Sequence, residues 1–207
     1  MPKLKLTYFD FDGGRGEPVR LALVLGGVPF EDDRVKFNDW GARKSGTPFG
    51  ALPVLEVDGV VISQSNTITR YVGKLTKLYP EDPWQAALCD EVMDAVEDLN
   101  GRIGVTMAIS DPAAKKAARE ELAAGPMSVH LERLNAYLES RGGEYFADNR
   151  LTVADLKIFS LVSHLSSGML DYIPADLADS VAPLLVAHSA RLKMHPKIAA
   201  YYEGRKS

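Results

Sequence analysis

The sequence has almost no cysteine and no long apolar run, and each absence excludes a class of protein. Cys89 is the single cysteine among 207 residues, so the chain has neither a disulfide framework nor a Cys-x-x-Cys redox pair. No window approaches the roughly 18 apolar residues of a transmembrane helix, and the opening MPKLKLTY lacks the apolar run of a signal peptide. We therefore expect a protein of a reducing, cytoplasmic compartment with no membrane partner.

An excess of one sign of charge is also missing. Lys and Arg number 24 against 28 Asp and Glu, which gives a net charge of −4 with both signs interspersed. Nucleic-acid binding normally needs a basic patch or stripe, so we expect no nucleic-acid partner. What is present is an ordinary globular composition, with 46% apolar residues in a chain long enough to bury a core without disulfides or metal.

The first 80 residues alternate between strand and helix patterns. Alternation of polar and apolar residues predicts strands, apolar residues at helical spacing predict helices, and the Asp58-Gly59 pair is a strong hairpin signal. In chain order the predicted elements are a strand over 3–9, a helix over 18–25, a strand over 29–37, a loop over 38–53, a hairpin over 54–63 and a helix over 66–78. The order is β-α-β followed by β-β-α.

Every pattern after the proline-rich segment 79–83 is helical. Asp111-Pro112 is expected to restart a helix and Gly125-Pro126 to break it, while Thr152-x-x-Asp155 resembles a capping box. The remaining helical patterns cover 84–109, 127–138, 151–165, 178–194 and 196–204. We predict an α/β domain over 1–80 and an all-α, helical-bundle domain over 81–207.

The glycine-rich turn GGRGE, residues 13–17, begins five residues after Tyr8 and allows two interpretations. A phosphate loop would need a Lys-Ser/Thr pair or G-x-G-x-x-G spacing, and the turn has neither. A tight turn that needs unusual backbone angles is the favoured interpretation. Taken alone, Tyr8 is more often a core or surface tyrosine than a catalytic one.

Two later features of the first domain favour a peptide-like ligand. Pro53 precedes a strand, where its missing N–H is tolerated, and a cis bond there would leave the backbone of Leu52 free to pair with an extended peptide. Gln64 and Ser65 stand at a predicted helix start, where backbone N–H groups and a hydroxyl suit a carboxylate. Ser65 as an ordinary N-cap explains the same pattern without a ligand.

Three carboxylates lie on one face of the long helix predicted over 84–109. Asp94, Glu97 and Asp98 are spaced i, i+3 and i+4, and their oxygens suit Mg²⁺ or Ca²⁺. A solvated acidic face is the commoner outcome, and we predict no metal site. Cys89, on the same helix, has no basic neighbour in sequence that would activate its thiol.

Several motifs, in the same order along nearly the full length, together resemble a cytosolic glutathione transferase, most closely of the sigma class. The motifs are KLTYF at 5–9, Asp39-Trp40 with Lys44 downstream, PFGALPVLEVDG at 48–59, QSNTITRYV at 64–72 and LTVADL at 151–156. The resemblance implies a thioredoxin-like domain followed by a helical domain, glutathione as co-substrate, and a homodimer.

The resemblance also implies the roles of residues around the glutathione sulfur. The hydroxyl of Tyr8 would hold the sulfur, with Arg15 close to it. The backbone of Leu52, before a cis Pro53, would pair with the cysteinyl part. The loop that carries Arg15 has one more residue than the sigma pattern.

The two ends of glutathione are assigned by the same resemblance. Trp40 and Lys44 would contact the glycyl carboxylate, and Gln64 and Ser65 the γ-glutamyl carboxylate. Asp98 would reach across the dimer to the γ-glutamyl amine of the ligand in the neighbouring subunit.

The function expected from this resemblance is conjugation of glutathione to small hydrophobic electrophiles, as in detoxification. A thiol of ordinary pKa, about 8.5, is only a few per cent thiolate at neutral pH, and a hydrogen bond from Tyr8 favours the reactive thiolate. The alternatives are a glutathione-dependent isomerase of the prostaglandin D synthase kind and a non-catalytic binding or structural relative. Val105 stands roughly where vertebrate prostaglandin synthases carry tryptophan, which disfavours the isomerase.

A second, apolar pocket is expected between the turn after Tyr8 and the long helix. Its candidate lining residues are Phe9, Phe11, Met107 and His164. A place in the core explains each of the four equally well.

Overall fold

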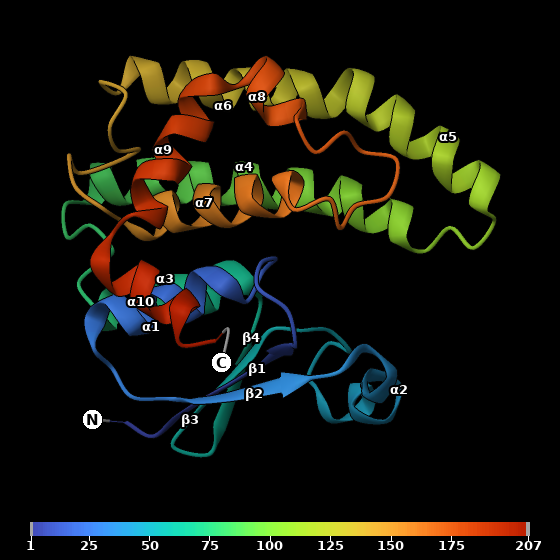
Figure 1. The fold of residues 1–207 in the computed structure, drawn as a ribbon. Coiled ribbons are helices and arrows are strands. Elements are labelled where there is room, and N and C mark those ends of the chain that lie inside the picture. The colour runs from blue at the N-terminus through green and yellow to red at the C-terminus, as the bar shows by residue number, and fades with distance from the viewer. Residues whose placement is uncertain (1, 206–207) are drawn as a thin grey trace.

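A four-stranded mixed sheet forms the base of the N-terminal part in the computed structural model, which describes residues 2–205 (Figure 1). The strands are β1 (Leu4–Phe9), β2 (Glu31–Val35), β3 (Val54–Val57) and β4 (Val60–Ser63). Their order is β2-β1-β3-β4, with β1 parallel to β2 and antiparallel to β3. The hairpin turns at Asp58 and Gly59, both at positive φ, which confirms the predicted turn.

Helices separate this sheet from the rest of the molecule. α1 (Glu17–Gly26), α3 (Ser65–Leu75) and α10 (Pro196–Glu203) lie between the sheet and the upper helices (Figure 1). Leu4 and Leu6 of β1 and Leu21 and Leu23 of α1 are buried together with the core of the helical part. The last helix of the chain, α10, packs on α1, so the C-terminal end of the sequence lies against the first domain.

The C-terminal part is a bundle around one central helix. Its helices are α4 (Pro83–Met107), α5 (Pro112–Leu122), α6 (Ser128–Ser140), α7 (Val153–Ser166), α8 (Leu177–Val181) and α9 (Pro183–Lys193). α7 is buried along most of its length and begins with the predicted capping box of Thr152 and Asp155. Within residues 2–205, none of the helices has both the length and the apolarity needed to cross a bilayer.

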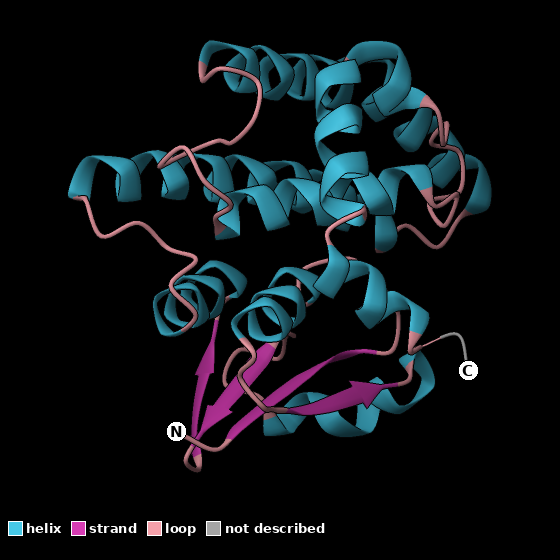
Figure 2. Ribbon diagram, turned by 60° about the vertical axis from the view of Figure 1, so that its left-hand side comes forward, coloured by secondary structure: helices cyan, strands magenta, loops and turns pink. Residues whose placement is uncertain are grey.

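The α/β arrangement followed by helices confirms the predicted fold class (Figure 2). Buried residues of β1, α1 and α3 form one continuous cluster with those of α4 and α7. A division at residue 80 therefore remains a prediction about domains, because the two parts share their core.

Three local predictions were wrong. The loop expected over 38–53 contains helical turns, the short helix α2 (Trp40–Arg43) between 3₁₀ turns at Phe37–Asp39 and Lys44–Gly46. The Gly125-Pro126 pair does not break its helix, because a π-helical segment, Ala123–Met127, joins α5 to α6. The wider π turn accommodates Pro126, which has no N–H to donate. Pro183 instead divides the helix expected over 178–194 into α8 and α9.

Candidate functional site

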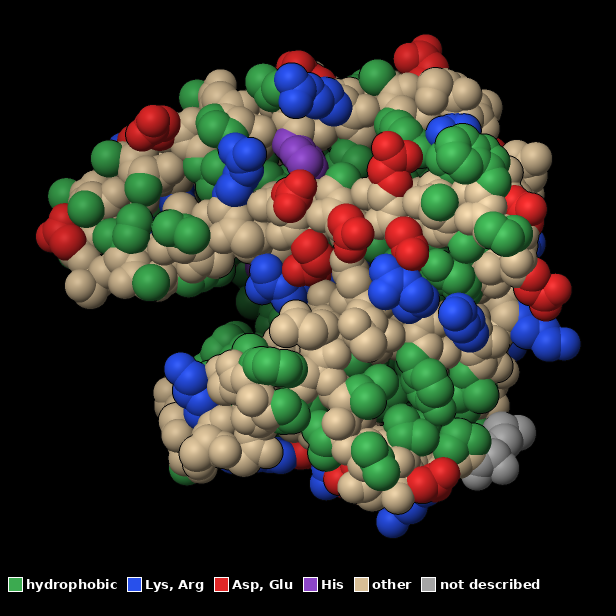
Figure 3. Space-filling model, turned by 180° about the vertical axis from the view of Figure 1, so that it is seen from behind, with side chains coloured by type: hydrophobic (Ala, Val, Ile, Leu, Met, Phe, Trp, Pro, Cys, Tyr) green, Lys and Arg blue, Asp and Glu red, His purple; other side chains and the backbone are tan. Residues whose placement is uncertain are grey.

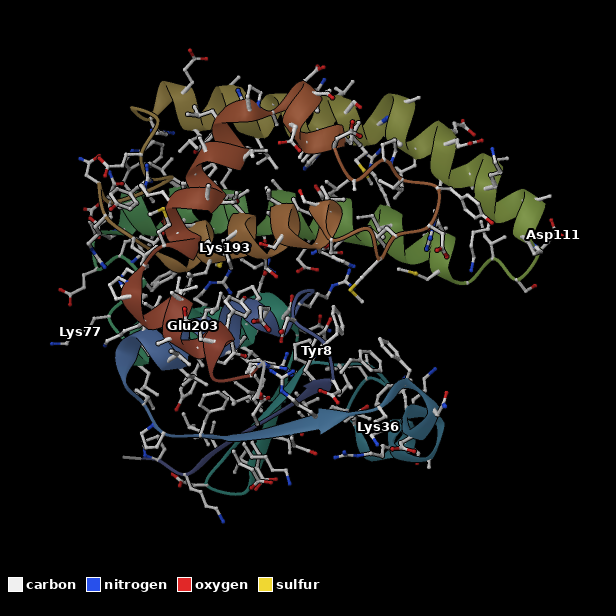
Figure 4. The ribbon with its side chains drawn as sticks, in the orientation of Figure 1. Tyr8, Lys36, Lys77, Asp111, Lys193 and Glu203 are labelled. Atoms are coloured by element: carbon white, nitrogen blue, oxygen red, sulfur yellow. The ribbon has the colours of Figure 1, made fainter. Side chains whose placement is uncertain are left out.

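Tyr8 ends β1 with its side chain buried, 6% exposed, at the junction of the sheet and the helical part (Figure 4). Its hydroxyl oxygen accepts a hydrogen bond from the backbone N–H of Arg15 at 3.0 Å. Burial raises the pKa of Tyr8 despite the opposing effects of Arg15 and Arg20, so the phenol keeps its proton at neutral pH. A protonated hydroxyl whose oxygen already accepts a bond has its own O–H left to donate to a ligand.

The glycine-rich turn packs directly on this tyrosine. Gly13 and Gly14 have φ of 137° and 64°, which confirms the expected unusual backbone angles. A Cβ on Gly16 would lie 2.4 Å from Cγ and Cδ1 of the Tyr8 ring, and one on Gly14 would lie 2.5 Å from its hydroxyl oxygen. The turn is therefore glycine-rich partly because it encloses Tyr8.

A first prediction concerns this close approach. Gly16 has φ −85°, which alanine tolerates, so Gly16→Ala acts through the collision with the Tyr8 ring alone. We expect the free energy of unfolding to fall by about 1–3 kcal/mol and turnover to fall as the ring is displaced. Urea unfolding and steady-state kinetics measure both.

The matched control for this prediction is Gly104→Ala in α4. Nothing lies within 4 Å of a Cβ built there, so removal of a helical glycine should stabilise the protein by about 0.5–1 kcal/mol. If Gly16→Ala behaves like Gly104→Ala, the packing of the turn on Tyr8 is not what constrains Gly16.

Beside Arg15 lies a cavity of about 250 Å³ between the loop before β3 and the start of α3. The expected cis peptide bond joins Leu52 to Pro53 in its wall. Gln64 has φ 74°, a conformation that residues other than glycine rarely adopt and that often marks a functional site. The cavity is lined by Arg15, Phe49, Ala51, Leu52, Pro53, Ser63, Gln64, Ser65 and Glu97.

Ser65 does not cap its helix, which corrects one of the two interpretations of this residue. Gln64 occupies the cap position, and no side chain caps the backbone there. The hydroxyl of Ser65 instead donates to Oε1 of Glu97 at 2.8 Å. The backbone N–H groups at the start of α3 thus have no side-chain cap and border the cavity, an arrangement suited to an anion.

Glu97 is the centre of a charged cluster that unites three elements. Nε of Arg15, from the turn, donates to its Oε2 at 2.6 Å, and the ammonium of Lys157, from α7, pairs with its Oε1. Burial acts to raise the pKa of Glu97, but Lys157 and Arg15 outweigh it and lower that pKa to about 2. The carboxylate therefore stays ionised throughout the physiological range.

Trp40 and Lys44 lie on the short helical segment that replaces the expected loop. The Trp40 ring packs edge-on against Phe9, the residue after Tyr8, with ring centroids 5.7 Å apart. Lys44 is exposed, and its side chain passes Gly50, close to the cavity. Neither residue lines the cavity itself, and their contacts with a ligand stay a prediction.

Aromatic rings gather on the other side of Tyr8. Phe9 stacks on Phe37 with centroids 4.8 Å apart, and Phe11 contacts both Phe37 at 5.9 Å and His164 at 5.8 Å. Figure 3 shows a hollow here between the helical and N-terminal parts, with apolar side chains in its depth. Met107 stands half-exposed at the end of α4, where its sulfur accepts a bond from Arg119. Phe37 was not among the predicted lining residues, because it falls at the end of the strand predicted over 29–37.

Comparison with known protein families identifies the chain. A family model described as "Glutathione S-transferase, N-terminal domain" matches residues 4–74. A second, "Glutathione S-transferase, C-terminal domain", matches residues 97–205. The chain belongs to the glutathione S-transferase family. The resemblance predicted from the sequence motifs is confirmed.

Relatives of the chain include proteins named glutathione S-transferase and proteins named prostaglandin D synthase. Glutathione S-transferase 1 of Ascaris suum is 37% identical over 86% of this chain and 87% of its own length. Hematopoietic prostaglandin D synthase of Gallus gallus is 33% identical over 99% and 98%. The solved prostaglandin synthase D of Nilaparvata lugens superposes with a TM-score of 0.88 at 34% identity, covering 99% of this chain and 98% of its own.

The acidic residues of α4 in this transferase do not share one environment. Asp94 is exposed and accepts a bond from Asn66 at 2.6 Å, whereas Glu97 turns into the charged cluster. The expected solvated face is therefore wrong for Glu97 and holds for Asp98, which is exposed. Within residues 2–205, no group of three His, Cys, Asp or Glu side chains is placed to hold a metal ion.

Cys89 is packed in the core between α4 and α7, as a structural thiol. Burial raises its pKa to about 12, so it is not ionised at neutral pH. Lys157 was not among the predicted site residues, although a single lysine inside the apolar pattern ADLKIFSLV is a signal that could have found it. A buried lysine at such a position needs a buried anion.

Proposed function

We propose that the protein binds glutathione in the cavity beside Arg15 and activates its thiol through a hydrogen bond from Tyr8. The observation that carries the proposal is the buried Tyr8 hydroxyl, which accepts from the Arg15 backbone and keeps its own proton to donate. A donor to the sulfur stabilises the thiolate, which is the nucleophile that attacks an electrophile. Tyr8 and Arg15 are the proposed catalytic residues.

The other proposed contacts with glutathione come mainly from residues that line the cavity. The backbone of Leu52, before cis Pro53, would pair with the cysteinyl part, and Gln64 and Ser65 would receive the γ-glutamyl carboxylate at the start of α3. Trp40 and Lys44 would contact the glycyl end from the neighbouring segment. The support for these roles is position beside one cavity, together with the family relationship.

The co-substrate side of the site is proposed to be the aromatic hollow. Phe9, Phe11, Phe37 and His164 would contact a hydrophobic electrophile placed next to the sulfur. Burial lowers the pKa of His164, and Arg119 acts in the same direction, so its imidazole is neutral near pH 7 and suits an apolar ligand. Met107, at the end of α4, would border the entrance. Small hydrophobic electrophiles fit this lining. A cytoplasmic, detoxifying role is proposed from the family relationship alone.

The experiment that tests the proposal measures binding and the state of the bound thiol. Calorimetric titration with glutathione should give saturable binding, and the ultraviolet absorbance of the bound thiolate should titrate well below the pKa of free glutathione. Conjugation of an aryl halide should follow. Absence of binding would refute the proposal, and binding with an unshifted thiol would indicate a carrier or structural relative.

A second candidate function is glutathione-dependent isomerisation. It is favoured by the relatives named prostaglandin D synthase, which match nearly the whole chain. An isomerase returns the thiol unchanged, whereas conjugation consumes it. Incubation with a prostaglandin endoperoxide and limiting glutathione, followed by a thiol count, distinguishes the two reactions.

We also propose that the protein works as a homodimer. Phe49 is 71% exposed on the loop beside the cavity, which is unusual for a phenylalanine. A partly apolar groove between α4 and α6, about 210 Å³ in volume and lined in part by Val92, Ala95 and Leu134, is a suitable receptor for it on a second copy. Asp98, exposed on α4, would then reach the γ-glutamyl amine of the ligand in the other subunit.

Phe49→Ser tests this arrangement. We expect light scattering to show a dimer for the natural chain and a single chain for the variant at the same concentration, because the inserted ring is lost. Met194→Ser removes an even more exposed apolar side chain, at 81% exposure, and should leave the dimer intact. A natural chain that is monomeric would remove Asp98 from the proposed site.

A further inference from the structure

Lys157 is a buried ammonium that the proposed glutathione chemistry does not yet use. It is 1% exposed in the middle of α7, between apolar neighbours. It pairs with Oε1 of Glu97 and lies 3.4 Å from the hydroxyl of Ser65. Burial of a lysine ammonium away from water costs free energy of folding unless an anion pairs with it, so the place of Lys157 in this cluster needs an explanation.

The charges of the cluster show what Lys157 changes. Arg15 carries one positive charge and Glu97 one negative charge, so these two alone would cancel beside the cavity. Burial lowers the pKa of Lys157 and the Glu97 carboxylate opposes this effect; with Lys157 protonated, the three side chains carry one net positive charge. Arg15 and Glu97 both line the cavity, and the charges of both act on the Tyr8 phenol, so the net charge of the cluster lies within electrostatic reach of the sulfur position proposed above.

We propose that Lys157 is a positioning residue that keeps the cluster of Arg15 and Glu97 net positive, so that the cluster as well as Tyr8 favours the glutathione thiolate. The proposal rests on the proposed function, because it concerns the sulfur bound at Tyr8. A nearby positive charge stabilises a thiolate over a thiol, and the effect is strong where water is excluded. Lys157 acts through Glu97. Because Lys157 pairs with the same carboxylate, Glu97 does not fully cancel the positive charge of Arg15.

The other charged and titratable groups around the cluster do not supply this charge. They are Tyr8 from β1, Arg20 from α1, Asp94 from α4 and His164 from α7. Arg20 is paired with both Glu17 and Asp32, and Asp94 is exposed and bonded to Asn66. His164 is neutral near pH 7, because its burial lowers its pKa.

The test compares the pH titration of the bound glutathione thiolate, by ultraviolet absorbance, in a charge-replacement series. Lys157→Met should raise the thiol pKa by about one unit, because Glu97 then cancels Arg15. Lys157→Met/Glu97→Gln removes one charge of each sign and should return the pKa to about the natural value. Lys116→Met, which removes an exposed ammonium paired with Glu120 on α5, should leave it unchanged.

Restoration in the double variant supports the proposal, because the thiol pKa then follows the net charge of the cluster. An unchanged thiol pKa in Lys157→Met overturns it, and so does a pKa that stays raised in the double variant. If Lys157→Met fails to fold, Glu97→Gln is the deciding variant. It leaves the cations of Lys157 and Arg15 without an anion, so the thiol pKa should fall below the natural value. Any other result overturns the proposal. A normal thiol pKa in the natural chain would instead refute the proposed function.

Discussion

Tyr8→Phe is expected to lower turnover at pH 7 by about 25-fold and to leave glutathione binding nearly intact. The variant keeps the ring that packs on Gly16 and loses only the hydroxyl that is free to donate to the sulfur. A hydrogen bond that lowers the thiol pKa from about 8.5 to about 6.5 changes the thiolate fraction by about 25-fold at pH 7 and approaches about 100-fold only at lower pH. Steady-state kinetics and calorimetric binding separate the two effects.

The deficit of Tyr8→Phe should depend on pH in one direction. Without the donor, the bound thiol pKa rises toward the ordinary value of about 8.5, so fewer molecules carry the thiolate near pH 7. As the pH rises above this value the thiol ionises in both proteins, and the difference in rate shrinks. Burial raises the pKa of Tyr8 itself, so the natural enzyme retains its phenolic proton across this range.

The matched control for Tyr8→Phe is Tyr145→Phe. Tyr145 contacts Arg191 through its ring face, in the helical part, so loss of its hydroxyl should change neither turnover nor the pH profile. If Tyr8→Phe and the natural chain have equal turnover from about pH 6 to about pH 8, Tyr8 is not a catalytic residue.

The sequence predicted those parts of the site that depend on local pattern. A proline before a strand, a hairpin at Asp58-Gly59 and a capping box at Thr152 need only a few neighbouring residues, and all three are present. The position of Tyr8 at the mouth of a glycine-rich turn follows from the same local order. What these residues contact in glutathione remains a prediction.

The charged cluster could not be predicted, because its members meet only through tertiary packing. Lys157 and Glu97 are 60 residues apart, and Lys157 and Ser65 are 92 apart. Helical spacing placed Glu97 on a face with Asp94 and Asp98 but could not show which neighbour covers that face. The packing of α7 against α4 and α3 decides this, and it makes Glu97 a partly buried partner of Lys157.

Arg20→Met is expected to give the largest loss of stability, about 3–5 kcal/mol in the free energy of unfolding. Arg20 is fully buried and its guanidinium donates to Glu17 at 3.1 Å, to Asp32 at 2.9 Å and to the carbonyls of Phe9 and Phe11. The variant leaves Glu17 buried without its cation. Urea unfolding at fixed protein concentration measures the loss, with Arg102→Met, at an exposed site of α4, expected within about 0.5 kcal/mol of the natural chain.

The same variant should be less destabilised in acid. Burial already raises the pKa of Glu17 although Arg20 opposes it, so removal of Arg20 raises that pKa further. The folded variant then holds a proton on Glu17 where the unfolded chain has lost it, and its stability increases as the pH falls through the raised pKa toward the ordinary value near about 4.3. Tyr202 of α10 also donates to Glu17, and Arg20 donates to the carbonyls of Phe9 and Phe11, so this buried pair joins the last helix to the segment after Tyr8. A loss of stability that does not depend on pH would mean that the unpaired Glu17 carboxylate is not its cause.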